Sequence, residues 1–364
     1  MMKLLSIVGA RPQFIKVAMV AATLKAHARG ASIEHHILHT GQHYDAAMSD
    51  CFFRELDIPN PEYHLGIGSG PHGVQTGKML AGIESILDDW RPDAVIVYGD
   101  TNSTLAGALA AAKLGIRVIH LEAGLRSFNR NMPEELNRVT TDHLSDLLLC
   151  PTATAMANAK REGLADRSHL TGDVMLDLLQ QHAAQLPRHP LAHDTYALVT
   201  VHRAENTEKP ERMVQFVNWL ERLPLRAVLP MHPRLLGKLS KQQRNCIERM
   251  EHVFVLPPCR YGEMIALERD AAVILTDSGG VQKEAYFLGV PCLTLRDETE
   301  WVETLAGGWN RIVSMEPDSI VKIVQSVIEC NGYMPTGKPD LGQFGSGLGA
   351  ETSVNAMIAA LEDA

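Results

Sequence analysis

The sequence predicts an α/β protein made of two consecutive units, each with a doubly wound parallel sheet. The chain has 364 residues, which suits two domains of ordinary size. Short apolar runs alternate with longer helical patterns along most of the chain. These runs are apolar throughout rather than at every second residue, as in parallel strands that helices cover on both faces.

Two series of strands are expected, one in each half of the chain. The first series is 4–8, 33–39, 94–98, 117–121 and 146–150. The second series is 197–201, 227–231, 253–256, 272–276 and 292–295. Helices are expected at 15–27, 74–87, 104–114, 133–145, 212–223, 282–288, 320–329 and 350–361.

The domain boundary is expected within 168–195. Segment 178–195 is polar and contains Pro187 and Pro190, and the strand rhythm restarts after it. The N-terminal domain is therefore assigned to 1–170 and the C-terminal domain to 171–349. The remaining residues, 350–364, follow a glycine-rich stretch and are expected to form a terminal helix that joins the N-terminal domain.

Composition and charge exclude several classes of protein. Lys and Arg number 34 and Asp and Glu 43, for a net charge of −9, and no basic block suggests a nucleic-acid groove. No apolar run approaches the roughly 18–20 residues of a membrane span, and the N-terminus lacks a signal peptide. The 6 cysteines are scattered without a CxxC pair. We interpret them as reduced thiols of a cytoplasmic protein.

The segments that follow the predicted strands are rich in chemically active residues. In open α/β sheets, ligands bind beyond the carboxyl ends of the strands. Because charged residues follow strands in both halves, we expect the ligand to bind in a cleft between the two domains. The segments are 9–12, 99–101, 122–126, 202–203, 232–234, 277–280 and 296–297.

Two segments are candidates for phosphate binding. Ser278, Gly279 and Gly280 follow a strand and open a helix, where free N–H groups bind anions, and Glu284 two turns on could accept from ribose hydroxyls. The alternative is a simple helix cap and tight turn. In the first loop, the cations of Arg11 and Lys16 could face the ligand, or could be two solvated surface charges.

Three carboxylates and a histidine are candidates for acid–base chemistry: Asp100, Glu122, Glu134 and His202. Each has an alternative structural role. Asp100 could cap a helix, and Glu134 could complement a helix dipole. Glu122 fits a structural role least well, because a carboxylate at a strand end needs a partner. His202 could be an ordinary buried histidine.

The sequence lacks the motifs that are typical of several other kinds of enzyme. No GxGxxG segment follows a buried strand and opens a helix, so a nicotinamide cofactor is disfavoured. There is no HExxH, cysteine cluster or carboxylate-rich Mg²⁺ pattern, and no GxSxG nucleophile elbow. We therefore expect neither a metal nor a cofactor.

Taken together, these segments resemble the non-hydrolysing UDP-N-acetylglucosamine 2-epimerase family. They occur in the family's order and cover nearly the whole chain. The matching motifs are Gly9–Lys16 (GARPQFIK), Gly99–Thr101, His120–Arg126 (HLEAGLR), Pro133–Arg138 (PEELNR), His202–Arg203, His232–Pro233 and Leu275–Glu284 (LTDSGGVQKE).

The resemblance implies two Rossmann-like domains in the glycosyltransferase-B-type fold, usually as a homodimer, with the final helix packed on the first domain. It implies roles in catalysis for Asp100, Glu122, Glu134 and His202. It places UDP against Arg11, Lys16, His202, Ser278, Gly279, Gly280 and Glu284. Gln42 and His43 resemble a segment that contacts a second, activating UDP-sugar in some bacterial members.

The reaction implied by the resemblance is inversion at C2 of a UDP-2-acetamido sugar, in bacterial surface-polysaccharide synthesis. A glycosyltransferase of the same fold and a catalytically silent UDP-sugar sensor are the alternatives. Within the family, the sequence at Gln13, at Ser127–Asn129 and at Thr141–Asp146 resembles that of enzymes that act on UDP-2,3-diacetamido-2,3-dideoxy-glucuronate. Gln13 in place of a glutamate would favour a substrate that carries its own carboxylate. The alternative is neutral drift within one specificity.

Overall fold

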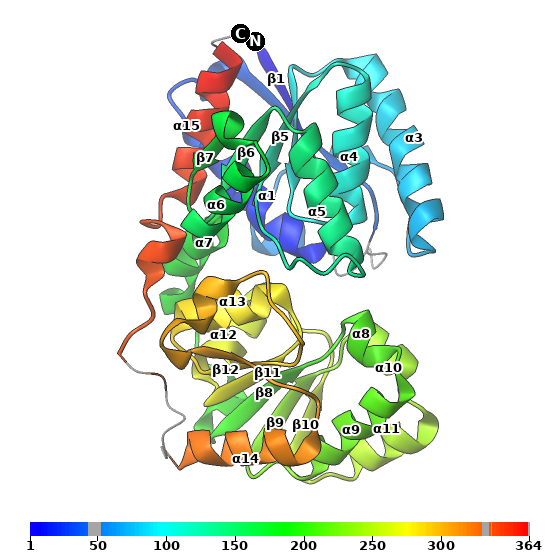
Figure 1. Ribbon diagram of the computed structural model, residues 1–364, viewed down its shortest axis with the longest axis vertical. Helices are drawn as coiled ribbons and strands as arrows, with labels where there is room; N and C mark the ends of the chain where they lie inside the picture. The colour runs from blue at the N-terminus through cyan, green and yellow to red at the C-terminus, as the bar shows by residue number, and fades with distance from the viewer. Residues whose placement is uncertain (43–51, 330–334, 336, 363–364) are drawn as a thin grey trace. The chain divides into compact units, whose positions relative to one another are not determined.

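The computed structural model describes residues 1–42, 52–329, 335 and 337–362. The chain divides into two compact units (Figure 1). Unit 1 comprises Met1–Gln180 and Leu341–Ala364, and unit 2 comprises Gln181–Asp340. The chain thus passes into unit 2 within helix α7 (Val174–His182), beyond the position 170 assigned from the sequence. Segment 178–195 holds the end of α7 and two 3-10 helices, Ala183–Gln185 and Pro190–His193.

Unit 1 is built on a parallel sheet with the strand order β3-β2-β1-β4-β5-β6-β7. The order reverses between β1 and β4, which is the point where open α/β sheets bind their ligands. The loops after β1, β4 and β5 therefore meet at one edge. The strands are β1 (Met2–Val8), β2 (Ile33–His39), β3 (Tyr63–His64), β4 (Ala94–Tyr98), β5 (Arg117–Leu121), β6 (Leu147–Cys150) and β7 (Ser168–Leu170).

Helices cover both faces of this sheet (Figure 1). Leu5 and Ile7 pack on the face covered by α3 and α4, and α1 packs against α15. Alternate residues of β1 thus serve opposite faces, which explains why consecutive residues such as Leu4 and Leu5, or Ile7 and Val8, are both apolar. The helices are α1 (Arg11–Ala26), α3 (His72–Trp90), α4 (Asn102–Lys113), α5 (Pro133–Leu144), α6 (Ala153–Arg161), α7 and α15 (Gly349–Glu362). Short 3-10 helices are Gly30–Ser32, Ala165–Arg167 and Leu341–Phe344.

The C-terminal helix α15 is bound to unit 1 at both ends. At its start, the Asp177 carboxylate accepts from the backbone N–H groups of Gly349 (3.0 Å) and Ala350 (2.7 Å). Near its end, Arg117 Nη1 donates to the carbonyl oxygen of Ala360 at 3.1 Å. The tail residues therefore complete the fold of unit 1.

Unit 2 repeats this plan with a parallel sheet in the order β10-β9-β8-β11-β12-β13. Its switch point lies between β8 and β11. The strands are β8 (Tyr196–Thr200), β9 (Arg226–Pro230), β10 (Val253–Leu256), β11 (Val273–Thr276), β12 (Cys292–Thr294) and β13 (Asn310–Ile312). The helices are α8 (Ala204–Thr207), α9 (Pro210–Glu221), α10 (Pro233–Lys238), α11 (Lys241–Glu248), α12 (Tyr261–Asp270), α13 (Gly279–Leu288) and α14 (Pro317–Ile328), with a 3-10 segment at Val302–Gly308.

The core of unit 2 lies on both faces of its sheet. Val199 and Leu275 belong to the cluster that contains Trp219 of α9, whereas Leu198 and Ile274 belong to the cluster on the other face. Every strand expected from the sequence is present, with ends shifted by one or two residues. Among the described helices, none is both long enough and apolar enough to cross a bilayer.

Candidate active site

The loop after β1 is fixed by the side chain of Gln13. Its Oε1 accepts from the backbone N–H groups of Gly9 (2.8 Å) and Ala10 (3.0 Å), and its Nε2 donates to the Tyr98 carbonyl at 2.9 Å. The amide is buried and links the first loop to the end of β4. This position gives Gln13 a local structural role, so the predicted effect on a substrate carboxylate does not follow from it.

The two cations of the first loop have different surroundings. The guanidinium of Arg11 lies over the ring of Phe52, 4.8 Å from its centroid. Lys16 is buried, and its Nζ lies 2.5 Å from Glu122 Oε1. Lys16 is therefore not a solvated surface charge, and Glu122 has the partner that a carboxylate at a strand end requires.

The carboxylate of Asp100 is held by an arginine on α5. Arg138 Nη2 bonds to Asp100 Oδ2, and Arg138 Nη1 lies 3.3 Å from Glu135 Oε2. Thr101, rather than Asp100, caps α4, because its hydroxyl accepts from Thr104 N. The capping alternative for Asp100 is therefore wrong. Arg138 lies in the motif 133–138, but nothing in the sequence alone distinguishes it from an ordinary surface arginine.

Gly99 lies against the ion pair of Lys16 and Glu122. Its φ of +61° favours glycine, and a Cβ built on it would lie 3.2 Å from Glu122 Oε1 and 3.3 Å from Lys16 Nζ. Glu122 itself has a φ of +71°, a conformation that is costly for a residue with a side chain. The surrounding contacts must hold that backbone in place.

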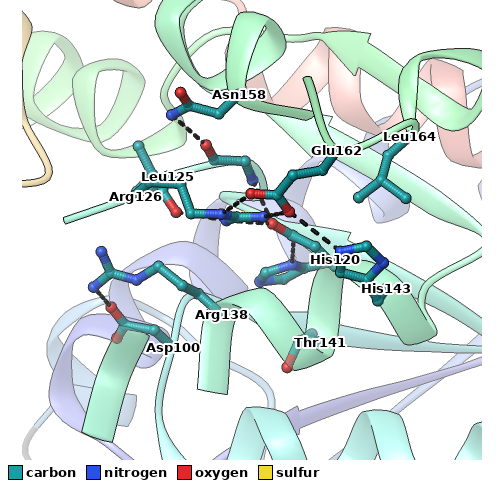
Figure 2. A network of polar contacts seen from close by, with 12 residues as sticks. Asp100, His120, Leu125, Arg126, Arg138, Thr141, His143, Asn158, Glu162 and Leu164 are labelled. Atoms are coloured by element: carbon teal, nitrogen blue, oxygen red, sulfur yellow. Dashed lines mark hydrogen bonds and ion pairs between the residues drawn. The ribbon is translucent and has the colours of Figure 1, made fainter. Parts of the chain in front are cut away.

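A polar cluster joins His120 of β5 to Arg126 and Glu162 (Figure 2). The His120 ring contacts Asp142 Oδ1 at 2.7 Å, and the second Asp142 oxygen lies 2.7 Å from Arg126 Nη1. Arg126 also makes a two-pronged contact with Glu162, at 2.7 and 2.6 Å. Burial raises the pKa of Asp142, but the His120 and Arg126 contacts outweigh it and hold that pKa below its usual value.

Glu134 and Glu135 occupy the first turn of α5 after Pro133, as the sequence predicts. Glu134 is half-buried. The carboxylate of Glu135 accepts from Ser127 N at 2.8 Å, Ser127 Oγ at 2.9 Å and Phe128 N at 2.9 Å. Glu135 thus closes the loop between β5 and α5, while Glu134 remains the candidate for chemistry.

In unit 2, the buried carboxylate of Asp277 organises the loop after β8. It accepts from His202 N (3.0 and 3.1 Å), Arg203 N (3.0 Å) and Asn206 Nδ2 (2.9 Å). Burial raises its pKa, and these donors act against that rise. Asp277 thereby connects the ends of β8 and β11, on either side of the switch point.

Ser278 begins α13 with its hydroxyl accepting from Val281 N at 3.4 Å, so the capping role proposed as an alternative is present. A Cβ on Gly279 would lie 2.8 Å from Glu300 Oε1, so a side chain there would clash. Glu284 lies one turn further along α13 and is buried. Lys283 Nζ lies 3.8 Å from the centroid of the Trp301 ring.

His202 is not an ordinary buried histidine. Its side chain is 29% exposed and its ring stacks on that of His232, with centroids 4.8 Å apart. His232 in turn accepts from Arg234 N and so caps α10. The two histidines therefore form an aromatic surface at the ends of β8 and β9.

The structure gathers the candidate residues in two groups. Unit 1 holds Arg11, Lys16, Asp100, Glu122 and Glu134, and unit 2 holds His202, Ser278, Gly279, Gly280 and Glu284. In the described part of the chain, no cluster of three or more His, Cys, Asp or Glu side chains could hold a metal ion. The Gln42 amide oxygen accepts from Ser103 N and Oγ, whereas His43 lies outside the described residues.

Residues 25–358 match the family model described as UDP-N-acetylglucosamine 2-epimerase. The chain belongs to this family. It is 49% identical over 330 residues to a UDP-N-acetylglucosamine 2-epimerase homolog of Methanococcus maripaludis, covering 88% of this chain and 91% of that one. It is 48% identical over 329 residues to the UDP-2,3-diacetamido-2,3-dideoxy-D-glucuronate 2-epimerase of Pseudomonas aeruginosa, with the same coverage.

A solved structure matches the epimerase over its whole length. The crystal structure of the Methanocaldococcus jannaschii UDP-GlcNAc 2-epimerase, in complex with UDP-GlcNAc and UDP, is 40% identical, with a TM-score of 0.88 and full coverage of both chains. The predicted α/β fold of glycosyltransferase-B type and the predicted enzyme class, an isomerase, are confirmed. The glycosyltransferase alternative has less support.

Proposed function

We propose that this epimerase inverts C2 of a UDP-2-acetamido sugar through the residues gathered at the two switch points. The observation that carries the proposal lies in unit 1, where two carboxylates that follow the neighbouring strands β4 and β5 each pair with a cation. These pairs are Lys16 with Glu122 and Arg138 with Asp100. Paired carboxylates in different environments are what a reaction that removes and returns a proton requires.

The chemistry of the substrate favours elimination. The C2 proton of a 2-acetamido sugar is not α to a carbonyl, so simple deprotonation is out of reach. A base can instead take the C2 proton while the C1–O bond to UDP breaks, giving a 2-acetamidoglycal and UDP. Re-addition of UDP to C1, with protonation of C2 on the opposite face, completes the inversion.

The residues of unit 2 suit the leaving UDP. The N-terminus of α13 at Ser278, Gly279 and Gly280 presents backbone N–H groups to a pyrophosphate, and Glu284 suits the ribose hydroxyls. His202 adds a donor at the end of β8. In unit 1, the family resemblance assigns Arg11 and Lys16 to UDP binding, and that role stays a prediction.

An incubation in D₂O tests the proposal. The enzyme is incubated with UDP-GlcNAc alone, without acceptor or added NAD, and the products are identified by NMR. The C2-inverted product should carry deuterium at C2, and a little glycal and UDP should appear on long incubation. Asp100→Asn, Glu122→Gln and Glu134→Gln should each lower turnover by orders of magnitude. Retention of the C2 hydrogen would contradict elimination, and transfer only with an added acceptor would favour a glycosyltransferase.

We further propose that the preferred substrate is a UDP-2,3-diacetamido-2,3-dideoxy-glucuronate. Two observations support this proposal. The first is the sequence of the motifs at Ser127–Asn129 and Thr141–Asp146. The second is the 48% identity to the UDP-2,3-diacetamido-2,3-dideoxy-D-glucuronate 2-epimerase of Pseudomonas aeruginosa. This proposal is tested by measuring kcat/KM for this sugar and for UDP-GlcNAc under identical conditions, and the value for the diacetamido-uronate should be higher. A higher value for UDP-GlcNAc would remove the substrate assignment and leave the epimerase activity standing.

A homodimer and a cytoplasmic location stay predictions. The first follows from the family resemblance and the second from the scattered cysteines. Light scattering of the purified protein at micromolar concentration should give twice the chain mass of 40.0 kDa. A mass of a single chain at that concentration would contradict the dimer.

A further inference from the structure

The buried ring of His120 lies between two oxygen atoms. Its Nδ1 is 2.7 Å from Asp142 Oδ1, and its Nε2 is 2.7 Å from the carbonyl oxygen of Gly99. A carbonyl oxygen only accepts hydrogen bonds, so Nε2 carries a proton. A second proton must lie between Nδ1 and Oδ1, because two facing lone pairs would repel each other.

The surroundings of Asp142 stabilise the negative charge of its carboxylate. The other oxygen of Asp142 accepts from Gly124 N at 3.1 Å and from Arg126 Nη1 at 2.7 Å. Three donors thus converge on one carboxylate, which favours its ionised form. Arg126 pairs with Glu162 as well as with Asp142, so each of these charges has a partner of opposite sign within the cluster.

The hydrogen bond from His120 to the Gly99 carbonyl connects the buried cluster to the candidate catalytic residues. A trans peptide is planar, so holding the Gly99 carbonyl also fixes the orientation of the Asp100 N–H. The Gly99 N–H donates to the Leu121 carbonyl at 3.0 Å. Gly99 is therefore tied on both sides to the two residues that precede Glu122, and both Gly99 and Glu122 have left-handed backbones that need such support.

We propose that His120, backed by Asp142, is a positioning residue that holds the Gly99–Asp100 turn against the end of β5. It thereby sets the carboxylate of Asp100 relative to that of Glu122. This inference rests on the proposed function, in which those two carboxylates act on the sugar. Neither His120 nor Asp142 touches the substrate in this proposal.

Two variants separate positioning from simple loss of a histidine. In His120→Gln, the new amide nitrogen can still reach Gly99, but its oxygen faces the Asp142 carboxylate and is repelled. The double variant His120→Gln/Asp142→Asn turns that repulsion into an amide–amide hydrogen bond, and leaves an oxygen to accept from Gly124 and Arg126. His143→Gln, which removes a half-exposed histidine beside Glu162, is the matched control.

The expected result is a loss in kcat rather than in binding. Turnover by His120→Gln should fall about 100-fold, the effect of a small misplacement of catalytic groups. Its KM should stay within about twofold, and more glycal should escape per inversion. The double variant should recover most of the lost kcat, and His143→Gln should match the unaltered enzyme.

The outcomes distinguish this inference from the proposed function. Unchanged kcat in His120→Gln, with Asp100→Asn and Glu122→Gln inactive, overturns the positioning role alone. A folded double variant as slow as the single one also overturns it. Near-normal turnover in Asp100→Asn and Glu122→Gln overturns the proposed site instead. Whether or not the variants fold, NMR of ¹⁵N-histidine-labelled unaltered protein should show the His120 Nε2 protonated and hydrogen-bonded, and an unprotonated Nε2 refutes the arrangement.

Discussion

Lys16 Nζ lies 2.5 Å from Glu122 Oε1, so the first helix of the chain is joined to the end of β5 by a buried ion pair. The two side chains are 4% and 12% exposed. Water therefore screens the pair little, and each charge depends on the other. The pair also links a cation expected at the pyrophosphate to a carboxylate expected at the sugar.

Removal of one partner of this pair should destabilise the protein more than removal of both. Lys16→Met leaves the Glu122 charge buried without its cation and should cost about 3 kcal/mol. Lys16→Met/Glu122→Gln should recover much of that loss while remaining inactive. Urea unfolding of both variants measures the effect. Equal midpoints for the single and double variants would contradict the dependence of one charge on the other.

Gln13→Glu should lower stability without changing substrate preference. The carboxylate would still accept from Gly9 and Ala10, but its second oxygen would face the Tyr98 carbonyl at about hydrogen-bond distance. Loss of that donor in a buried site should cost about 1–3 kcal/mol. Thermal unfolding measures the loss, and the kcat/KM ratio for the two UDP-sugars should stay constant. A changed ratio would restore Gln13 as a determinant of substrate choice.

Gly99→Ala should impair turnover, whereas Gly115→Ala should not. Both glycines have a positive φ, +61° and +69°, so an added Cβ strains each backbone by about 1–2 kcal/mol. At Gly99 the Cβ also crowds Lys16 and Glu122, while at Gly115 nothing lies within 4 Å. Steady-state kinetics of the two variants should therefore differ although their stability losses are similar. Equal kcat values would mean that the crowding is harmless.

Ser278→Ala should weaken UDP binding, and Ser240→Ala provides its control. Both serines cap a helix of unit 2 through the side-chain oxygen, so each substitution should cost about 1 kcal/mol of stability. Only Ser278 lies at the proposed pyrophosphate site. Calorimetry with UDP should show weaker binding by Ser278→Ala and by Arg11→Ala, at about 1.5–3 kcal/mol each. Unchanged affinity in both would remove the proposed UDP site.

Stability should fall in mild acid because of His35. Burial, with a smaller effect of His36, lowers the pKa of His35 from 6.5 to about 4. Below pH 6.5 the unfolded chain takes up a proton that the folded chain resists, so stability present above pH 6.5 is lost as the pH falls toward 4. The loss should reach about 3 kcal/mol at most. His35→Gln, which can still bond Ser6, should flatten this dependence, and His36→Gln should keep it.

The sequence predicted the sheets well because most of their strands are runs of buried, mainly apolar residues. It missed the short strands β3, β7 and β13, most of whose residues are not buried, whereas the equally short β12 is buried throughout and was predicted. It also missed α7, whose apolar residues precede a polar stretch that was interpreted as a linker. Val174, Leu176 and Leu178 are buried in that helix. The polar residues of 178–195 belong to the end of α7 and to two 3-10 helices, and not to an unstructured linker.

The sequence predicted the candidate site residues that follow strands in recognisable motifs. It did not predict the buried charged residues that support them. Asp100, Glu122 and Ser278 stand out because they directly follow strands. Asp142 does not, because a carboxylate in the middle of an amphipathic helix looks like an ordinary surface residue. Only the tertiary structure shows that it is fully buried against His120.

The attachment of α15 to unit 1 has a consequence for the order in which this chain folds during synthesis. Unit 2 is continuous in sequence and can fold as soon as it has left the ribosome. Unit 1 lacks the helix that packs on α1, and the groups that Asp177 and Arg117 bind, until residues 349–360 emerge. The N-terminal half of the protein must therefore wait, partly assembled, for the last segment to be translated.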